Sequence, residues 1–390
     1  MELVEIKGQK NLIKEFLMLP VRLYKDEKNW IRPLDNDIEA VFDPAKNKNF
    51  RRGEATRWIL RDAQGRTIGR VAAFFDKKSK NKGNDQPTGG MGFFECINDQ
   101  AAANILFDAC KEWLKERGLE AMDGPINFGD RDRWWGLLVE GFTEPNYCMP
   151  YNFLYYKDLL ENYGFKLYFK QYTYHRPVKN LPLGDKLEAR ADKIIADPDY
   201  QFRYIKKSKL DDAAHYFRTV YNAAWARHSG VKEMSELQAK SIMKQLKPVI
   251  DPKLIYFGFY KGEPVSFFLS LPELNQVFKH VNGKLNLIGK LKFLYYKYLG
   301  KNKKIFGLVF GVSPEHQGKG VDAAMIKSYT GLAWKASFPY EDIEMNWIGD
   351  FNPKMMRVCE QIGAKIIKTH ITYRKLFDES IEYKRMPIID

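Results

Sequence analysis

The segment from Ile305 to Tyr329 constrains the fold of this chain more than any other. Its apolar run, Ile305 to Val312, predicts a buried strand, and Ser313-Pro314 ends that strand because proline cannot donate to a ladder. Gln317-Gly318-Lys319-Gly320 comes next, and apolar residues then recur at spacings of three and four from Val321 to Tyr329. The segment therefore predicts a strand, a glycine turn and a helix N-terminus in direct succession.

This succession is typical of an anion-binding site. The N–H groups of a first helical turn are free, and the helix dipole favours negative charge beside them. Gly318 and Gly320 allow positive φ and close approach of a phosphate to the backbone, and Lys319 adds a positive charge. The alternative interpretation is an ordinary tight strand-to-helix turn, because short glycine motifs often occur without a ligand.

The chain is long enough for two cores. It has 390 residues, of which 45% are hydrophobic, and this predicts an α/β protein of two domains, residues 1–178 and 179–390. Each half has helices, a hairpin, a strand, a helix, a strand, a helix that ends in glycine, and a last strand, which is a weak internal repeat. Among these elements we expect helices at 150–165 and 211–226, and an irregular aromatic loop at 133–142.

Composition excludes several classes of protein. No run of 18 or more apolar residues is present, so no membrane span is expected. The N-terminus lacks an apolar signal-peptide core, and the four cysteines and six histidines have no paired metal-ligand spacing. We therefore expect a cytoplasmic protein without a metal site. The net charge of +14 lies largely in local lysine clusters, such as residues 77–82, which favours solvated surface over a nucleic-acid interface.

Three motifs in the second half resemble the GNAT family of acyltransferases. Gln317-Gly318-Lys319-Gly320 is similar to the family's [Q/R]-x-x-G-x-[G/A] pyrophosphate loop, and Val312-Ser313-Pro314 to its V-x-P strand end. Asn352, eleven residues before Gly363, resembles the family's helix beside the coenzyme A tail. The resemblance implies two tandem GNAT-like domains, each a mixed, mostly antiparallel twisted sheet flanked by helices. It also implies acetyl-CoA or another acyl-CoA as co-substrate.

The resemblance further implies which residues bind the co-substrate. Residues Gln317 to Val321 would hold the phosphates, and the backbone at Val312 would pair with the pantetheine amides. Asp322 stands where the pattern has glycine or alanine, and its carboxylate would repel a pyrophosphate if it pointed toward one. The first half has Asn98-Asp99-Gln100 at the matching turn, without glycine or a basic residue, so we expect no coenzyme A in that half.

Candidate catalytic residues lie near the end of the chain. Glu344 and Asn346 share one face of a predicted strand, so Glu344 is a candidate base, with a solvent-facing carboxylate as the alternative. Cys359 stands where the family often has an acidic tyrosine, and is either a proton donor or a small core residue. Tyr373 is another candidate acid, with packing as its alternative role.

These residues favour an N-acyltransferase that moves an acyl group from acyl-CoA to an amine by direct attack. The amine would belong to a small molecule, a peptide or a protein, and the sequence predicts neither the acceptor nor the oligomeric state. Asp322 and Cys359 leave open a non-catalytic protein that binds coenzyme A or a metabolite. An aminoacyl-tRNA-dependent transferase is a third interpretation, which the coenzyme A-type loop argues against.

Overall fold

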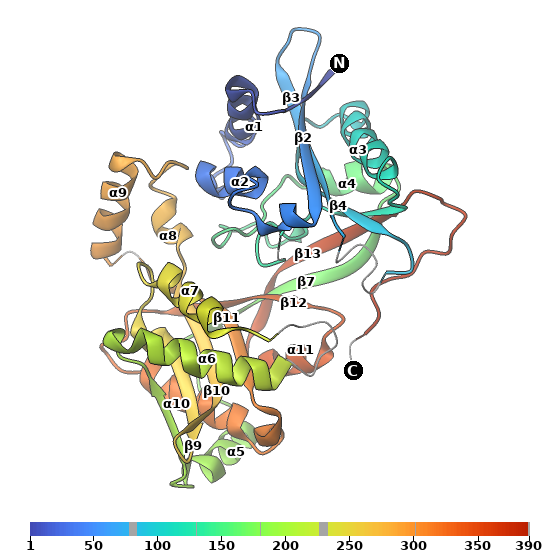
Figure 1. Cartoon of the computed structure of the whole chain (residues 1–390). Coiled ribbons are helices and arrows are strands. Elements are labelled where there is room, and N and C mark those ends of the chain that lie inside the picture. The colour runs from blue at the N-terminus through green and yellow to red at the C-terminus, as the bar shows by residue number, and fades with distance from the viewer. Residues whose placement is uncertain (78–83, 130, 180, 226–232, 301, 389–390) are drawn as a thin grey trace.

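A computed structural model describes residues 1–77, 84–129, 131–179, 181–225, 233–300 and 302–388 of the chain (Figure 1). Most of the lysine cluster at 77–82 lies outside these residues. The strands are β1 (Glu2–Glu5), β2 (Gly53–Arg61), β3 (Thr67–Asp76), β4 (Thr88–Cys96), β5 (Ala121–Gly124), β6 (Leu137–Glu140), β7 (Lys166–Pro177), β8 (Tyr200–Tyr204), β9 (Ile255–Tyr260), β10 (Glu263–Pro272), β11 (Lys304–Val312), β12 (Asp342–Gly349) and β13 (Lys365–Leu376).

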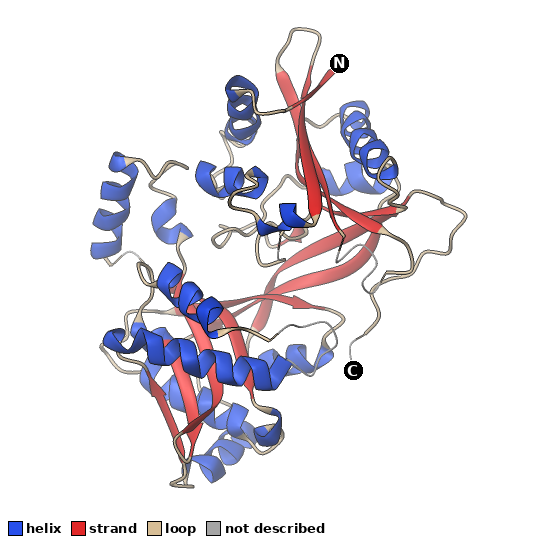
Figure 2. Ribbon diagram, viewed as in Figure 1, coloured by secondary structure: helices blue, strands red, loops and turns tan. Residues whose placement is uncertain are grey.

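Helices cover both faces of the sheet (Figure 2). They are α1 (Lys10–Leu23), α2 (Asp35–Phe42), α3 (Gln100–Lys115), α4 (Tyr156–Asn162), α5 (Asp185–Ile195), α6 (Leu210–Trp225), α7 (Glu236–Leu246), α8 (Asn275–Phe278), α9 (Leu287–Tyr298), α10 (Val321–Ala333) and α11 (Pro353–Gln361). In the second half, α6 packs on β10 and β11 from one side, and α10 packs on β8 to β10 from the other. The mixed α/β class expected from the sequence is confirmed.

The described strands form one continuous sheet in the order β1-β2-β3-β4-β5-β13-β7-β12-β11-β10-β9-β8, with β6 paired to β13. Two pairs are parallel, β4 with β5 and β11 with β12, and they occupy corresponding places in the two halves. The last strand of each half is exchanged: β13 pairs with β5 of the first half, and β7 pairs with β12 of the second. The expected domain boundary at residue 178 stays a prediction. Strands of both halves belong to the same sheet.

Local sequence explains most element boundaries. Helix α6 ends within one residue of the expected 211–226, and α10 begins directly after Gly320, as expected. The helix expected at 150–165 is shorter, since α4 begins only at Tyr156. Phe153 instead stacks on Tyr24 at a centroid distance of 4.4 Å, and this aromatic contact holds the segment before α4 outside the helix.

The loop expected at 133–142 contains a strand. Leu138 in β6 donates its N–H to Asn152 Oδ1 at 2.7 Å, and its carbonyl accepts from Asn152 Nδ2 at 3.0 Å. The amide side chain of Asn152 therefore pairs with both backbone groups of Leu138 in this short strand. The contact spans 14 residues, and a pattern of alternating hydrophobicity does not predict it.

Candidate functional site

Strands β11 and β12 run together and then diverge. Their parallel pairing extends from Lys304 and Asp342 to Gly307 and Met345. Beyond Gly307, the described residues of β11 pair only with β10, and the matching end of β12 pairs only with β7. The edge of β11 that faces β12 is thus open over about five residues, or ~17 Å of strand.

The glycine turn lies at the open end of this gap. Gln317 donates its side-chain N–H to the carbonyl of Val312 at 2.8 Å, which closes the turn onto the end of β11. Gly318 has φ +72° and Gly320 has φ +102°, in the region that favours glycine. A Cβ on Gly320 would also come within 3.0 Å of the Arg190 carbonyl oxygen. Because Gly320 precedes α10 and has no side chain, it leaves the N-terminus of a 13-residue helix uncapped toward the gap.

The carboxylate of Asp322, in the first turn of α10, is engaged by a cation from another helix. Arg190 Nη2 of α5 lies 3.0 Å from Oδ1 and 3.1 Å from Oδ2 of Asp322. The sequence left open whether this carboxylate would repel an anion at the turn. Its charge is paired with a guanidinium, so the N-terminus of α10 retains its positive character, aided by Lys319.

An apolar cavity of about 70 Å³ lies beside the gap between the two strands. Its lining includes Phe310 on β11, Met345 on β12, Met325 and Tyr329 on α10, and Cys359 on α11, together with residues of β7 and β10. A cavity of this size has room for a short apolar segment.

Cys359 is fully buried in this wall. Burial, with a contribution from Glu360, raises the pKa of its thiol to about 12. Tyr174 of β7 packs in the same cluster, and its buried hydroxyl has no hydrogen-bond partner among the described residues. Burial also raises the pKa of Tyr174 to about 12. Sequence reasoning missed Tyr174, because only the exchange of β7 into the second half brings it beside α11.

Glu344 lies on the opposite face of β12 from Met345, one residue before the parallel pairing ends. It is buried, not solvent-facing: Lys304 Nζ pairs with Oε1, and Asn146 Nδ2 donates to Oε2 at 2.8 Å. The same Asn146 amide reaches Asn346 Oδ1 at 3.0 Å, so Glu344 and Asn346 do share a face. Asn146 comes from the first half and could not be linked to Glu344 from sequence.

Two further ionisable groups are buried near Glu344. Lys368 of β13 contacts Thr143 Oγ1, and burial lowers its pKa to about 8, partly offset by Glu344. Glu273 accepts backbone N–H groups of Tyr147 and Asn275, and burial raises its pKa to about 7. Proton-exchanging groups near neutral pH are therefore gathered on this side of the sheet.

The remaining predicted residues lie farther from this cluster. Asn352 caps α11, with its Oδ1 accepting from Met355 N at 3.2 Å. Tyr373 belongs to the hydrophobic core of the first half, where its hydroxyl donates to Glu161 at 2.8 Å. The structure thus places Tyr373 outside the lining of the apolar cavity, whereas Cys359 belongs to that lining.

The corresponding helix of the first half is capped. Asp99 accepts from Ala101 N at 2.8 Å and from Ala102 N at 3.1 Å, so its side chain takes the place that an anion would have. This fits the prediction that the first half binds no coenzyme A.

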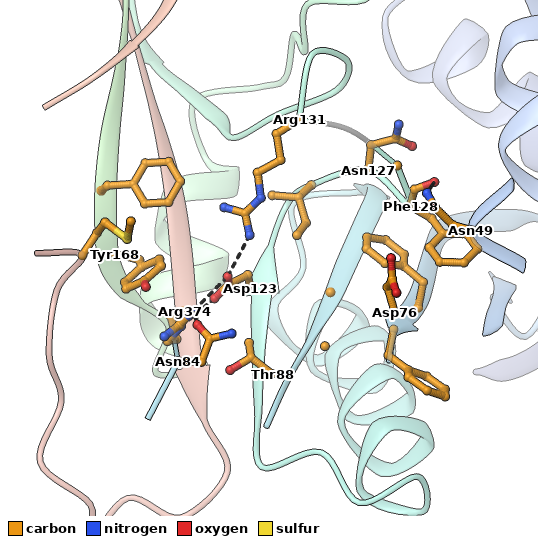
Figure 3. Close-up of a pocket in the computed structure, with 18 of the residues that line it drawn as sticks. Asn49, Asp76, Asn84, Thr88, Asp123, Asn127, Phe128, Arg131, Tyr168 and Arg374 are labelled. Atoms are coloured by element: carbon orange, nitrogen blue, oxygen red, sulfur yellow. Dashed lines mark hydrogen bonds and ion pairs between the residues drawn. The ribbon is translucent and has the colours of Figure 1, made fainter. Parts of the chain in front are cut away.

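A larger cavity of about 390 Å³ lies between the two halves, with a lining that is both polar and apolar (Figure 3). At its wall, Arg374 of β13 donates to both oxygens of buried Asp123, at 2.6 and 3.0 Å, and Arg131 reaches the same carboxylate at 3.1 Å. Arg374 lies over the Tyr168 ring, 3.6 Å from its centroid. Two guanidinium groups thus share one carboxylate, and the Arg374–Asp123 pair joins the exchanged β13 to β5.

Comparisons with known proteins agree with this architecture. No family model matches the chain. It is 28% identical over 370 residues to the "Bacterial ceramide synthase" of Caulobacter vibrioides, covering 93% of this chain and 94% of that protein. It is also 26% identical over 372 residues to "Protein YghO" of Escherichia coli, covering 94% and 93% of the two chains.

Solved structures show the same fold. A tandem GNAT protein from the clavulanic acid biosynthesis pathway has a TM-score of 0.53 at 10% identity, covering 97% of this chain and 99% of that one. A GCN5-related glucosamine N-acetyltransferase region of a fungal multi-domain β-N-acetylglucosaminidase has a TM-score of 0.55 at 12% identity, covering 96% and 38%. The similarity extends over both halves of the chain.

Proposed function

Because this chain is a tandem GNAT-fold protein, we propose that it is an N-acyltransferase that uses acyl-CoA and acylates a long-chain amine. The observation that carries the proposal is the gap between β11 and β12, which opens directly in front of the uncapped N-terminus of α10. Backbone N–H groups, two glycines of positive φ and Lys319 surround the point where phosphates would lie.

Several features of the gap fit an acyl-CoA. The open edge of β11 offers unpaired amides to an extended pantetheine arm, in the manner of strand addition. The apolar cavity beside Phe310 and Met345 would take a few methylene groups of the acyl chain. Acyl-CoA supplies the thioester that is attacked by the amine.

The polar cluster on the other face of β12 would receive the amine. Glu344, which Lys304 and Asn146 hold in place, is the proposed base that takes a proton from the amine through water. Tyr174 and Cys359 are the proposed donors toward the leaving thiolate, and the unpartnered hydroxyl favours Tyr174.

The acceptor class rests on the curated relative. A ceramide is an amide of a fatty acid with a long-chain amino alcohol, so a long-chain acyl-CoA and a long-chain amine are the first substrates to test. The alternative is a non-catalytic or regulatory protein that binds coenzyme A or a metabolite.

Calorimetric titration of acetyl-CoA and of palmitoyl-CoA tests the site. We expect Gly320→Glu to weaken binding at least 30-fold, about 2 kcal/mol, because the new carboxylate would lie at the helix N-terminus in a strained backbone position. Gly331→Glu, the same change on an exposed glycine of α10 with open space around it, is the matched control. No binding at millimolar ligand, or equal binding by both variants, overturns the proposed site.

Thiol release with a panel of amines then tests the reaction. Turnover with a long-chain amino alcohol but not with peptide amines supports the proposed acceptor. Binding of acyl-CoA without turnover of any amine supports the non-catalytic alternative.

A further inference from the structure

Helix α9 exposes an apolar face to solvent. Leu287, Leu291, Leu294 and Tyr298 follow one another at spacings of four, three and four, so they form one stripe along the helix. Leu287 is 75% exposed, Leu291 60% and Tyr298 84%. With the exposed Ile288 and Tyr295, the stripe spans about 120° of the helix circumference.

The opposite face of α9 is already used for packing. Phe293 packs on Phe278 of α8 at a centroid distance of 5.3 Å, and Tyr296 stacks on His280 at 3.8 Å. A Cβ on Gly289 would lie 1.9 Å from the Lys284 carbonyl oxygen, so the helix sits closely on the segment before it. The apolar stripe therefore faces away from the protein body and does not belong to its core.

The α8–α9 segment is fixed at the periphery of the molecule (Figure 1). The carbonyl of Gly283 accepts from Asp35 N at 2.9 Å, and Glu273 accepts the N–H groups of Asn275 and Gln276 at the start of α8. Phe278 packs with Leu34 of the first half. The stripe is thus held in a fixed direction by both halves.

Lysines border the stripe on both sides. At 3.6 residues per turn, Lys290 lies along one edge and Lys292 along the other, and both are exposed. Lys297, on the side of Lys290, donates to the carbonyl of Pro248 at 2.7 Å and helps to fix the helix. An apolar face bordered by lysines is typical of helices that lie in the plane of a bilayer interface, where long lysine stems let the ammonium groups reach anionic headgroups.

A second copy of the chain fits this face less well. A twofold dimer through α9 would place the same lysines of each copy next to those of the other. A single face of a 12-residue helix is also small for a stable interface, which usually buries at least 1,200 Å² or so in total. The net charge of +14 instead complements an anionic surface.

We propose that α9 docks this protein onto the surface of an anionic bilayer, with Leu287, Leu291, Leu294 and Tyr298 inserted at the interface and the bordering lysines on the headgroups. None of the helices in the described residues is long and apolar enough to cross a membrane. The docking does not depend on acyl transfer and can be tested without substrate.

Cosedimentation of the full chain with vesicles tests the proposal. We expect binding to phosphatidylcholine vesicles that contain 30% phosphatidylglycerol, and at least tenfold weaker binding by Leu287→Glu/Leu291→Glu. Leu154→Glu/Leu237→Glu makes the same charge change at two other exposed leucines, 64% and 82% accessible, and should bind as the wild type does. Lys290→Gln/Lys292→Gln should lose affinity mainly for the anionic vesicles.

The same samples distinguish the other outcomes. Thermal melting should be unchanged in every variant, because all the substituted side chains are exposed. Absence of wild-type binding to vesicles, or equal loss in the Leu154→Glu/Leu237→Glu control, overturns the proposal. A dimer in sedimentation velocity that Leu287→Glu/Leu291→Glu dissociates, without vesicle binding, would assign the face to a second copy and overturn it as well.

Discussion

Arg190 and Asp322 form an ion pair between α5 and α10, with one guanidinium nitrogen 3.0 and 3.1 Å from the two carboxylate oxygens. The pair lies beside the glycine turn, where a carboxylate without a partner would oppose the binding of a phosphate. It explains how the turn tolerates an acidic residue in place of the glycine or alanine of the related motif. The role of Gln317, Lys319 and Gly320 in binding a phosphate stays a prediction.

Arg190→Ala should weaken the binding of acyl-CoA about fivefold, roughly 1 kcal/mol, because it leaves the Asp322 charge unpaired at a partly exposed site. Asp322→Ala should bind at least as tightly as the wild type, and the double variant should return close to it. Titration calorimetry at low salt measures all three, and the differences should shrink at high salt. Unchanged affinity in Arg190→Ala would contradict this account.

Glu344→Gln should lower kcat about 100-fold while leaving the Kd of acyl-CoA within twofold, because the base acts on the amine and not on the co-substrate. The control is Glu341→Gln, an exposed carboxylate just before β12 that pairs with Lys303. Thermal melting separates a catalytic loss from unfolding, since Lys304 would lose its charged partner. A kcat equal to that of the control would exclude Glu344 as the base.

Tyr174→Phe should lower kcat about tenfold and at the same time raise the free energy of unfolding by about 1 kcal/mol, because it removes a buried hydroxyl without a partner. Tyr172→Phe, on the same strand, should change neither. Cys359→Ala should lower kcat less than threefold, since the unpartnered hydroxyl of Tyr174 is the proposed donor. The reverse order of effects on kcat would assign proton donation to Cys359.

The stability of the protein should fall as pH rises through 7 because of Glu273. Burial raises its folded pKa to about 7, above the ordinary glutamate value of 4.5. The stabilising effect of the protonated form is therefore fully present below pH 4.5 and is lost between pH 4.5 and 7. The full effect is about 3 kcal/mol. Urea titrations of the wild type and of Glu273→Gln from pH 4.5 to 8 measure it, and parallel curves for the two would show that Glu273 does not titrate in this range.

Much of the candidate site could be predicted because it is local. Residues Ile305 to Tyr329 contain the strand, the turn and the helix in one continuous segment, and their conformations depend on neighbours a few residues away. Positive φ at Gly318 and Gly320, and the start of α10 after Gly320, follow from that segment alone. The cap on helix α3 of the first half could also be predicted from the sequence, since Asp99 lies directly before that helix.

Contacts between residues that are far apart in the sequence could not be predicted from local sequence patterns. Arg190 and Asp322 are 132 residues apart, and Asn146 and Glu344 are 198 apart. Glu344 had a solvent-facing alternative, because alternation along a strand tells which residues share a face but not what covers that face. The cover is a loop of the first half that carries Asn146.

By itself, the sequence determined the local elements, the α/β class and the glycine turn at Gln317 to Gly320, because short-range hydrogen bonds and hydrophobic periodicity encode them. Only the tertiary structure decided that β7 and β13 exchange places, that Tyr174 reaches Cys359, and that α9 turns its leucines outward. These relationships depend on which apolar faces bury one another, and burial is settled by the packing of the whole chain and not by any one segment.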